Sequence, residues 1–310
     1  MQRLRRRRWF GISGKALVGL LTVMALALPA AQAGRANAAT RAAKALQGCG
    51  AELYWTNSLG RSINRSNLIG NDARGILYNR YIPLGLAVVD GNLYWADQGN
   101  GTINEANRDG SDAHVIVRDQ NKPFGVAANY QYLYWSNQGN GTINRSDLNG
   151  QDARAIVHNQ AKPNFIALMP YSGEIYWADA AGWLGDAGNI NEANPDGSDA
   201  HTIVRDQKHP FGVAVDIHHI YWSNIGRDTI NMANPDGSDA HTIVWDQHAV
   251  TGVADGGGSL YWALGKSVHA SGTIDPTGMV VRADLYGHSA HVIVHDQSYP
   301  RGLTVAGAFC

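Results

Sequence analysis

The stretch Leu93-Tyr94-Trp95-Ala96 decides how this chain folds, because its central Tyr-Trp pair recurs along the sequence. Successive pairs lie 40, 40, 42, 45 and 40 residues apart. Self-similarity at such a period indicates a repeat architecture, in which each repeat is one supersecondary unit. The six copies are Tyr54-Trp55, Tyr94-Trp95, Tyr134-Trp135, Tyr176-Trp177, Tyr221-Trp222 and Tyr261-Trp262.

Four short strands per repeat are predicted from the residues around each pair. After Leu93–Ala96 come a strand-like run at Thr102–Ala106, a turn at Asp109–Asp112, a β-branched run at His114–Val117 and an apolar run at Pro123–Ala127. Short β-branched and aromatic runs bounded by Gly, Asn, Asp and Pro are typical of sheet. Four strands in about 40 residues predict one propeller blade. The sequence therefore predicts an all-β, six-bladed β-propeller whose repeated Trp side chains are core rather than ligand contacts.

Three motifs carry a family resemblance: Tyr54-Trp55-Thr56-Asn57, Ile143–Gly150 and Pro83–Asp90. They are similar to the Tyr-Trp-Thr-Asp, Ile-x-Arg-Ala-x-Leu-Asp-Gly-Ser and Pro-x-Gly-Leu-Ala-Val-Asp motifs of the YWTD repeats, also called low-density lipoprotein receptor class B repeats. The resemblance covers about residues 52–306. It implies a propeller of YWTD type and, by analogy, a binding role. The receptor's cysteine-rich modules are absent from this sequence, so its lipoprotein and growth-factor partners are not implied.

Residues 1–33 have the layout of a bacterial export signal. Clustered arginines precede an apolar run at Ala16–Leu28 and a small-x-small cleavage pattern at Ala31-Gln32-Ala33. Cleavage after Ala38 is an alternative. Arg7-Arg8 partly resembles a twin-arginine signal, so Sec and twin-arginine export both stay open. The apolar run is too short to cross a bilayer as a helix.

The mature chain is expected to consist of a short linker, residues 34–48, and the propeller, residues 49–310. Loss of the signal changes the formal net charge from −1 to −7, because the signal holds six cationic side chains and no carboxylate. A mildly acidic surface argues against nucleic acid or an anionic membrane as a partner. We expect a secreted, extracellular monomer without a membrane span.

The order of the segments predicts how the ring closes. The chain enters at Leu53-Tyr54-Trp55, the second strand of a blade, and ends at Gly302–Val305, which matches a first strand. The last strand should therefore complete the first blade. Cys49 and Cys310 flank these two strands, and export permits a disulfide between them in place of the missing hairpin. Two free thiols at frayed ends are the alternative.

We expect the ligand site on one face of the ring, the mouth, which carries the loops before each inner strand and after each Tyr-Trp strand. The two largest insertions, Ala180–Gly188 and Gly265–Met279, fall in these loops. The loops before the inner strands also vary between repeats, and their cationic and aromatic side chains suit a polar or anionic protein, peptide or carbohydrate. The expected ligand-binding residues are Arg80, Tyr81, Lys122, Lys162, Trp183, Lys208, His209, His248, Tyr299 and Arg301. A solvated rim without a ligand is the alternative.

Two other functions stay open. Six-bladed propellers of similar outline include lactonases and lyases, so a hydrolase or lyase acting at the channel mouth is the second hypothesis. Its first candidate acid–base groups are His209, His248, His269 and Asp275. The third hypothesis is a non-catalytic scaffold. No cofactor is expected, although a calcium ion at the channel mouth stays open.

The face opposite the mouth, the base, is expected to carry repeated turns that single out no ligand. The run Asp109–His114 holds Asp, Ser and His, and it recurs at Asp196–His201 and Asp236–His241. A catalytic triad needs one constellation rather than several copies around a ring. The run therefore predicts a turn between outer strands.

Overall fold

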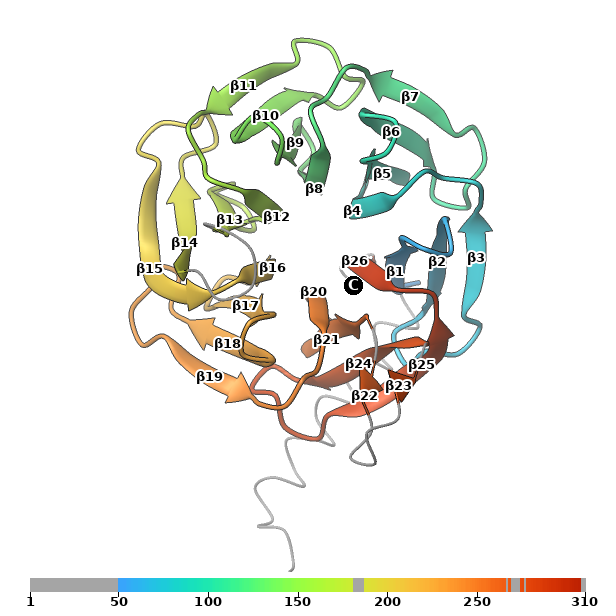
Figure 1. The fold of residues 1–310 in the computed structure, drawn as a ribbon. Coiled ribbons are helices and arrows are strands. Elements are labelled where there is room, and N and C mark those ends of the chain that lie inside the picture. Colours follow the sequence, from blue (N-terminus) through green and yellow to red (C-terminus); the bar gives the residue numbers. More distant parts are fainter. Residues whose placement is uncertain (1–49, 181–186, 266, 269–273, 276, 308–310) are drawn as a thin grey trace, which may run out of the picture.

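Each Tyr-Trp segment forms the second strand of a four-stranded antiparallel sheet, and six such sheets surround a central axis (Figure 1). The computed structural model describes residues 50–180, 187–265, 267–268, 274–275 and 277–307, with the backbone alone for 267–268 and 274–275. The predicted all-β, six-bladed propeller is confirmed. In this part of the chain no helix is long and apolar enough to cross a bilayer.

The blades are listed from the inner to the outer strand. Blade 1 consists of β26 (Pro300–Ala306), β1 (Glu52–Asn57), β2 (Ser62–Asn67) and β3 (Arg74–Leu77). Blade 2 consists of β4 (Pro83–Val89), β5 (Asn92–Asp97), β6 (Thr102–Asn107) and β7 (His114–Val117), and blade 3 of β8 (Pro123–Ala128), β9 (Tyr132–Asn137), β10 (Thr142–Asp147) and β11 (Arg154–Val157). Blade 4 consists of β12 (Pro163–Leu168), β13 (Ile175–Asp179), β14 (Ala187–Ala193) and β15 (His201–Lys208), and blade 5 of β16 (Pro210–Val215), β17 (Ile220–Asn224), β18 (Thr229–Ala233) and β19 (His241–Val244). Blade 6 consists of β20 (Val250–Gly256), β21 (Ser259–Leu264), β24 (Gly278–Asp284) and β25 (His291–Gln297), with a hairpin of β22 (Ser267–Val268) and β23 (Ile274–Asp275) inserted before β24.

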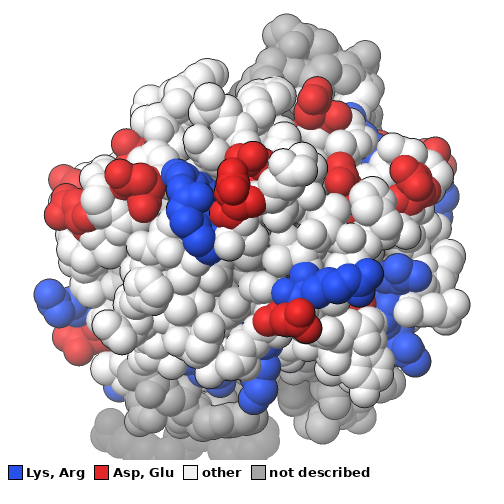
Figure 2. Space-filling view, turned by 90° about the horizontal axis from the view of Figure 1, so that it is seen from above, with Lys and Arg blue, Asp and Glu red and all other residues white. Residues whose placement is uncertain are grey.

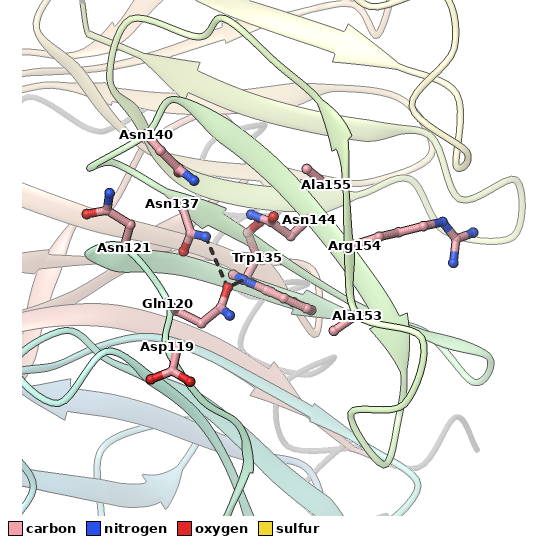
Figure 3. Close-up of a pocket in the computed structure, with 10 residues that line it drawn as sticks. All are labelled: Asp119, Gln120, Asn121, Trp135, Asn137, Asn140, Asn144, Ala153, Arg154 and Ala155. Carbon is pink, nitrogen blue, oxygen red and sulfur yellow. Dashed lines mark hydrogen bonds between the residues drawn. The ribbon is translucent and has the colours of Figure 1, made fainter.

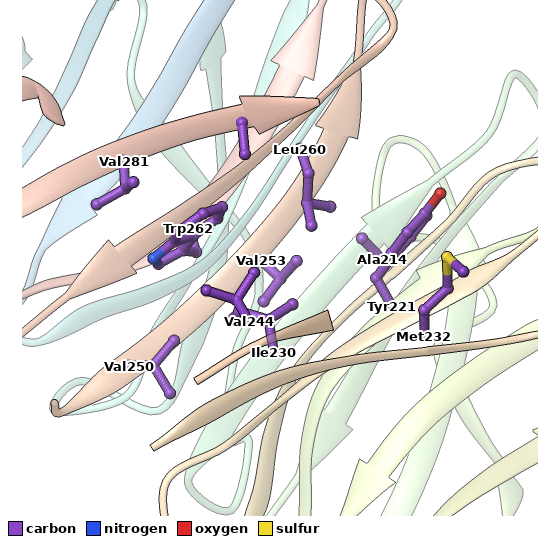
Figure 4. Packing of buried hydrophobic residues seen from close by; sticks show 11 residues of the cluster. Ala214, Tyr221, Ile230, Met232, Val244, Val250, Val253, Leu260, Trp262 and Val281 are labelled. Carbon is purple, nitrogen blue, oxygen red and sulfur yellow. The ribbon is translucent and has the colours of Figure 1, made fainter. Parts of the chain in front are cut away.

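The Tyr-Trp pairs hold neighbouring blades together. Side chains of adjacent strand residues point to opposite faces of a sheet, so the Tyr of one blade shares a core cluster with the Trp of the next. In the joint between blades 5 and 6, for example, Tyr221 and Trp262 belong to one cluster (Figure 4). All twelve side chains are at most 2% exposed. The prediction that the repeated tryptophans are core is confirmed.

A glutamine fastens five of the six indoles. In blades 2 to 6 a Gln at or just after the end of the outer strand accepts a hydrogen bond from the Trp Nε1 of the following blade, so the bond crosses the joint between blades. The donor–acceptor distances are 2.7 Å for Trp55 to Gln297, 2.7 Å for Trp135 to Gln120, 2.9 Å for Trp177 to Gln160, 2.8 Å for Trp222 to Gln207 and 2.8 Å for Trp262 to Gln247. Arg80 occupies the corresponding position before blade 2, and Nε1 of Trp95 is buried without a partner.

The last strand completes the first blade, as predicted. β26 pairs antiparallel with β1 from Glu52 opposite Ala306 to Trp55 opposite Leu303. Cys49 and Cys310 lie outside the described residues, so the disulfide stays a prediction. The described ends are nevertheless adjacent, since a Cβ added to Gly307 would lie 2.4 Å from Cβ of Ala51.

Arg108 bridges the two chain ends from the neighbouring blade. Its Nη2 donates to the carbonyl oxygens of Gly50 at 3.1 Å and Ala306 at 3.2 Å. Its Nε donates to the hydroxyl of Tyr54 at 2.9 Å and lies 3.4 Å from the carboxylate of Glu52. A cation that bonds both ends joins them at the place where the other blades have a covalent hairpin.

We predict that non-reduced mature protein contains a Cys49–Cys310 disulfide. Closing a loop of nearly the whole chain should stabilise the fold by about 2–5 kcal/mol. Peptide mapping by mass spectrometry should recover the linked pair, and reduction should lower the urea midpoint of unfolding. Exported protein with two free thiols would contradict the prediction.

The glutamine bonds predict opposite effects at two equivalent positions. Gln120→Ala should destabilise the fold by about 1–3 kcal/mol, because it leaves the buried Nε1 of Trp135 without an acceptor. Arg80→Gln should stabilise it by about 1 kcal/mol by supplying the acceptor that Trp95 lacks. Urea unfolding followed by tryptophan fluorescence measures both. Gln131→Ala, an exposed glutamine in a hairpin of the base, is the control, and equal losses at positions 120 and 131 would refute the role of the bond.

Candidate functional site at the mouth

Aromatic side chains from consecutive blades meet at the mouth end of the inner strands. The rings of Phe124, Phe165 and Phe211 lie 5.2 to 5.3 Å apart in edge-to-face pairs, and Leu84 of blade 2 packs against them. Phe165 occupies the position where the other five inner strands have glycine. An apolar cluster shared by blades 2 to 5 is therefore buried at this end of the inner strands.

Arg301 of β26 contacts this cluster from blade 1. Its guanidinium carbon lies 5.1 Å from the ring centre of Phe211 and 4.3 Å from that of Tyr299, within the range of cation–π attraction. Its Nε is buried without a hydrogen-bond partner. Burial lowers the pKa of Arg301, and within the described residues no carboxylate offsets that effect. A guanidinium remains charged even so. Arg301 is therefore a half-buried cation, with its Nε buried, that has no carboxylate partner among the described residues.

His209 belongs to the same group of side chains. Its ring is only 9% exposed and stacks on Phe211 with centres 6.4 Å apart. The structure thus brings together three of the residues predicted from sequence, Arg301, Tyr299 and His209, around a phenylalanine that sequence reasoning did not select.

A second group lies between blades 2, 3 and 4. Lys122 and Lys162 line a cavity of about 460 Å³ together with Gln98, Gly99, Gln138 and Ala161. Tyr81 borders it, because Gly99 donates its backbone N–H to the Tyr81 carbonyl at 2.9 Å. The predicted residues Lys122 and Lys162 therefore share one cation-lined hollow, and Tyr81 lies beside it against Gly99.

The remaining predicted residues lie elsewhere on the ring or outside the described residues. Arg80 donates from Nε to the carbonyl oxygen of Tyr78 on the rim, at 2.9 Å. His248 is exposed and its Nδ1 lies 3.1 Å from the carboxylate of Asp228. Lys208 ends β15, two residues before the inner strand of blade 5. Trp183 lies outside the described residues, so its predicted role is untested.

The candidate acid–base groups do not assemble into a catalytic centre within the described residues. His209 is stacked and His248 is paired with Asp228 on another loop. His269 lies outside the described residues, and only the backbone of Asp275, in β23, is described. No group of three or more His, Cys, Asp or Glu side chains suited to a metal ion occurs in the described part of the chain.

A smaller polar cavity of about 220 Å³ lies in the joint between blades 2 and 3 (Figure 3). Gln120, Trp135 and Asn137 line it, and Oδ1 of Asn137 is buried without a partner. The equivalent oxygens of Asn57 and Asn224 are also unpartnered. This repetition ties the cavity to the blade joint, where an ordered water would satisfy each oxygen, rather than to a specific ligand.

The Asp-Gly-Ser-Asp runs on the base are turns, as predicted. The Ser111 hydroxyl donates to Oδ1 of Asp109 at 2.6 Å, and Ser198 and Ser238 repeat this bond to Asp196 and Asp236. Hydrogen bonds from Ser111 lower the pKa of Asp109. Nδ1 of His114 lies 2.7 Å from the Asp112 carbonyl oxygen rather than against the serine, which is turn geometry and not that of a triad.

The outer edge of the ring offers no continuous patch of one charge in the view of Figure 2, where Lys and Arg side chains are interspersed with Asp and Glu. Polyanion binding needs a basic stripe or patch. The side of the ring seen in this view therefore shows no such stripe.

Comparisons with known proteins show the fold alone. No protein-family model matches the chain, and no curated protein does. A chain in the crystal structure of a nidogen/laminin complex is similar with a TM-score of 0.72 and 21% identity, covering 84% of this chain and 100% of that one. A gluconolactonase from Xanthomonas campestris is similar with a TM-score of 0.55 and 22% identity, covering 70% of this chain and 76% of the enzyme. Both identities are below 25%, so these similarities show a shared fold and not a function.

A strongly perturbed acid lies away from the mouth, between blades 5 and 6. Asp255 of β20 stands where the equivalent inner strands have Val88, Val215 and Val305. Burial, together with the carboxylate of Asp216, raises the pKa of Asp255 to about 7. A carboxyl group with a strongly shifted pKa can indicate a functional site, but Asp255 lies in the joint between two blades.

The raised pKa of Asp255 predicts how stability changes with pH. The pKa of Asp255 is higher in the folded state than the unfolded value of 3.8. The folded protein is therefore most stable, with respect to this group, below pH 3.8, and this stabilisation is lost as the pH rises through about 7. The free energy of unfolding should fall by up to about a few kcal/mol less between pH 4 and pH 8 in Asp255→Val than in the unaltered protein. Urea unfolding at several pH values measures it. Asp255→Asn should act likewise, and an unchanged slope in both variants would contradict the prediction.

Proposed function

We propose that this protein is an extracellular binding module whose mouth recognises an anionic group on a protein, peptide or carbohydrate. The observation that carries the proposal is Arg301, whose half-buried guanidinium lies against Phe211 and Tyr299, with its Nε buried and without a carboxylate partner among the described residues. A buried charge is costly unless it is paired. An incoming carboxylate, sulfate or phosphate would supply the missing partner.

Because it stacks on aromatic rings, Arg301 is suited to binding an anion. Two aromatic rings fix the guanidinium while its N–H groups keep their hydrogen-bonding capacity for a ligand. A guanidinium pairs with a carboxylate or phosphate through two parallel hydrogen bonds, which gives geometric specificity as well as attraction. The nearby apolar cluster lowers the local polarity and strengthens such a pair.

The cavity at Lys122 and Lys162 provides a second anchor on the same face. Its volume of about 460 Å³ lies within the range of sites for small ligands. Lysine ammonium groups attract anions, and the amides of Gln98 and Gln138 supply further donors and acceptors. A ligand with more than one polar group could contact both anchors.

A protein partner accords with the nidogen/laminin likeness, since that ring was crystallised in a protein complex. The gluconolactonase likeness keeps an enzyme as the second candidate. The second residues of the inner strands are Leu84, Phe124, Asn164, Phe211, Thr251 and Arg301. Only Asn164 and Thr251 among them carry side-chain oxygens, whereas calcium takes about six to eight oxygen ligands. The binding proposal is therefore the better supported of the two.

Replacing Arg301 should separate binding from stability. The equivalent residue of blade 2 is Leu84, so Arg301→Leu should fold without a large loss of stability, because leucine is accommodated at this position of the inner strand and the half-buried, unpaired charge is removed. Binding to acidic peptides, each paired on an array with its Asn or Gln counterpart, should fall at least tenfold. Arg227→Leu, an exposed arginine on a loop of the same face, is the matched control.

Acidic peptides that bind Arg301→Leu as tightly as the unaltered protein would contradict the proposal. A catalytic turnover that survives the substitution would favour the enzyme instead.

A further inference from the structure

Three large apolar side chains project from the base, on the hairpins that join the first and second strands of blades 3, 4 and 5. Tyr130 is 76% exposed, Tyr171 94% and Ile217 54%. We call these three residues the crest. Single exposed apolar side chains are ordinary, but here three occur on consecutive hairpins of one face.

The hairpins that carry the crest lie side by side. A Cβ added to Gly173, in the hairpin of blade 4, would lie 3.6 Å from the side-chain nitrogen of Asn129, in the hairpin of blade 3. Met169, which precedes the hairpin of blade 4, packs on the cluster that contains Val215, the last residue before the hairpin of blade 5. The three tips therefore occupy one continuous half of the base.

The fold itself does not require a crest. Blade 2 makes the same connection with Asp90-Gly91 and blade 6 with Gly257-Gly258, neither of which exposes an apolar side chain. Tyr171 also has a left-handed backbone with φ of 73°, a conformation that favours glycine. A nearly fully exposed tyrosine in a strained position adds nothing to the core, so its presence points to contact with another molecule.

The surroundings of the crest are acidic. The base loops of blades 3 to 5, residues 129–131, 147–154, 169–174, 194–201, 216–219 and 234–241, contain eight carboxylates and one arginine, Arg154. Hydrogen bonds from Ser198 and Ser238 lower the pKa of Asp196 and Asp236, so these two carboxylates are charged at neutral pH. The ring of Tyr132, two residues from the crest, already holds the guanidinium of Arg145 at 4.2 Å.

We propose that the crest is a second interaction surface, for a segment of a partner protein that combines lysine or arginine with apolar side chains. The tyrosine faces would hold apolar groups and cations, and the surrounding carboxylates would attract the basic charges. The surface is independent of the mouth, where the proposed ligand is anionic. The base, which the repeated turns had suggested to be uniform, is thus differentiated by its inner hairpins.

The probe is a fluorescein-labelled octapeptide of alternating arginine and leucine, measured by fluorescence anisotropy with the full-length mature protein. We expect saturable binding that weakens with added salt, because the attraction between exposed charges is screened. The same peptide with glutamate in place of arginine should not bind. Tyr130→Ser combined with Tyr171→Ser should weaken binding at least tenfold, whereas Tyr78→Ser, a matched change of an exposed tyrosine on the rim, should not.

Two further variants sharpen the result. Tyr171→Gly should keep or raise the thermal midpoint, because glycine relieves the left-handed backbone, and yet weaken binding of the peptide. Arg301→Leu at the mouth should leave peptide binding unchanged, which separates this surface from the proposed anion site. Equal binding of the glutamate peptide, or arginine-peptide binding that survives the double tyrosine change, would overturn the proposal. So would calorimetric binding of cellohexaose that the double change abolishes, since it would identify the crest as a carbohydrate platform.

Discussion

The packing of a tyrosine from one blade with a tryptophan from the next is the contact on which the rest of the structure depends. A four-stranded sheet of this size exposes apolar residues on both faces and cannot bury them alone. The Tyr-Trp strand solves this, because its alternation sends one aromatic ring to each neighbouring blade. Six such joints then close the ring.

In five of the six joints, a hydrogen bond from the indole to a glutamine adds a polar contact to the apolar packing. An indole N–H buried between sheets needs an acceptor, and the preceding blade supplies one from the loop that leads into the next inner strand. That loop therefore serves the joint while its following residues form the mouth. The blade joints therefore also hold the candidate site in place, since Gln120 and Gln207 anchor the loops that carry Lys122 and His209.

The joint between blades 1 and 2 departs from this scheme. Arg80 replaces the glutamine, and Trp95 keeps an unpartnered indole nitrogen. On the opposite face of the same joint, Arg108 reaches across to bond both chain ends. The ring is cut at blade 1, so this arginine adds polar bonds where the covalent connection is missing.

Sequence alone determined the six-bladed propeller fold, because few other folds are compatible with six Tyr-Trp pairs at a nearly constant spacing. It also determined the order of closure and the burial of the tryptophans, which depend on strand order and apolar pattern. Of the site, sequence selected Arg301, Tyr299, His209, Lys122 and Lys162 as residues of variable loops. Only the tertiary structure decided which of them meet, since Arg301 and Phe211 are far apart in the chain and come together through ring closure. The crest depends equally on tertiary structure, because the exposure of Tyr130, Tyr171 and Ile217 is set by how tightly each hairpin packs on its neighbours.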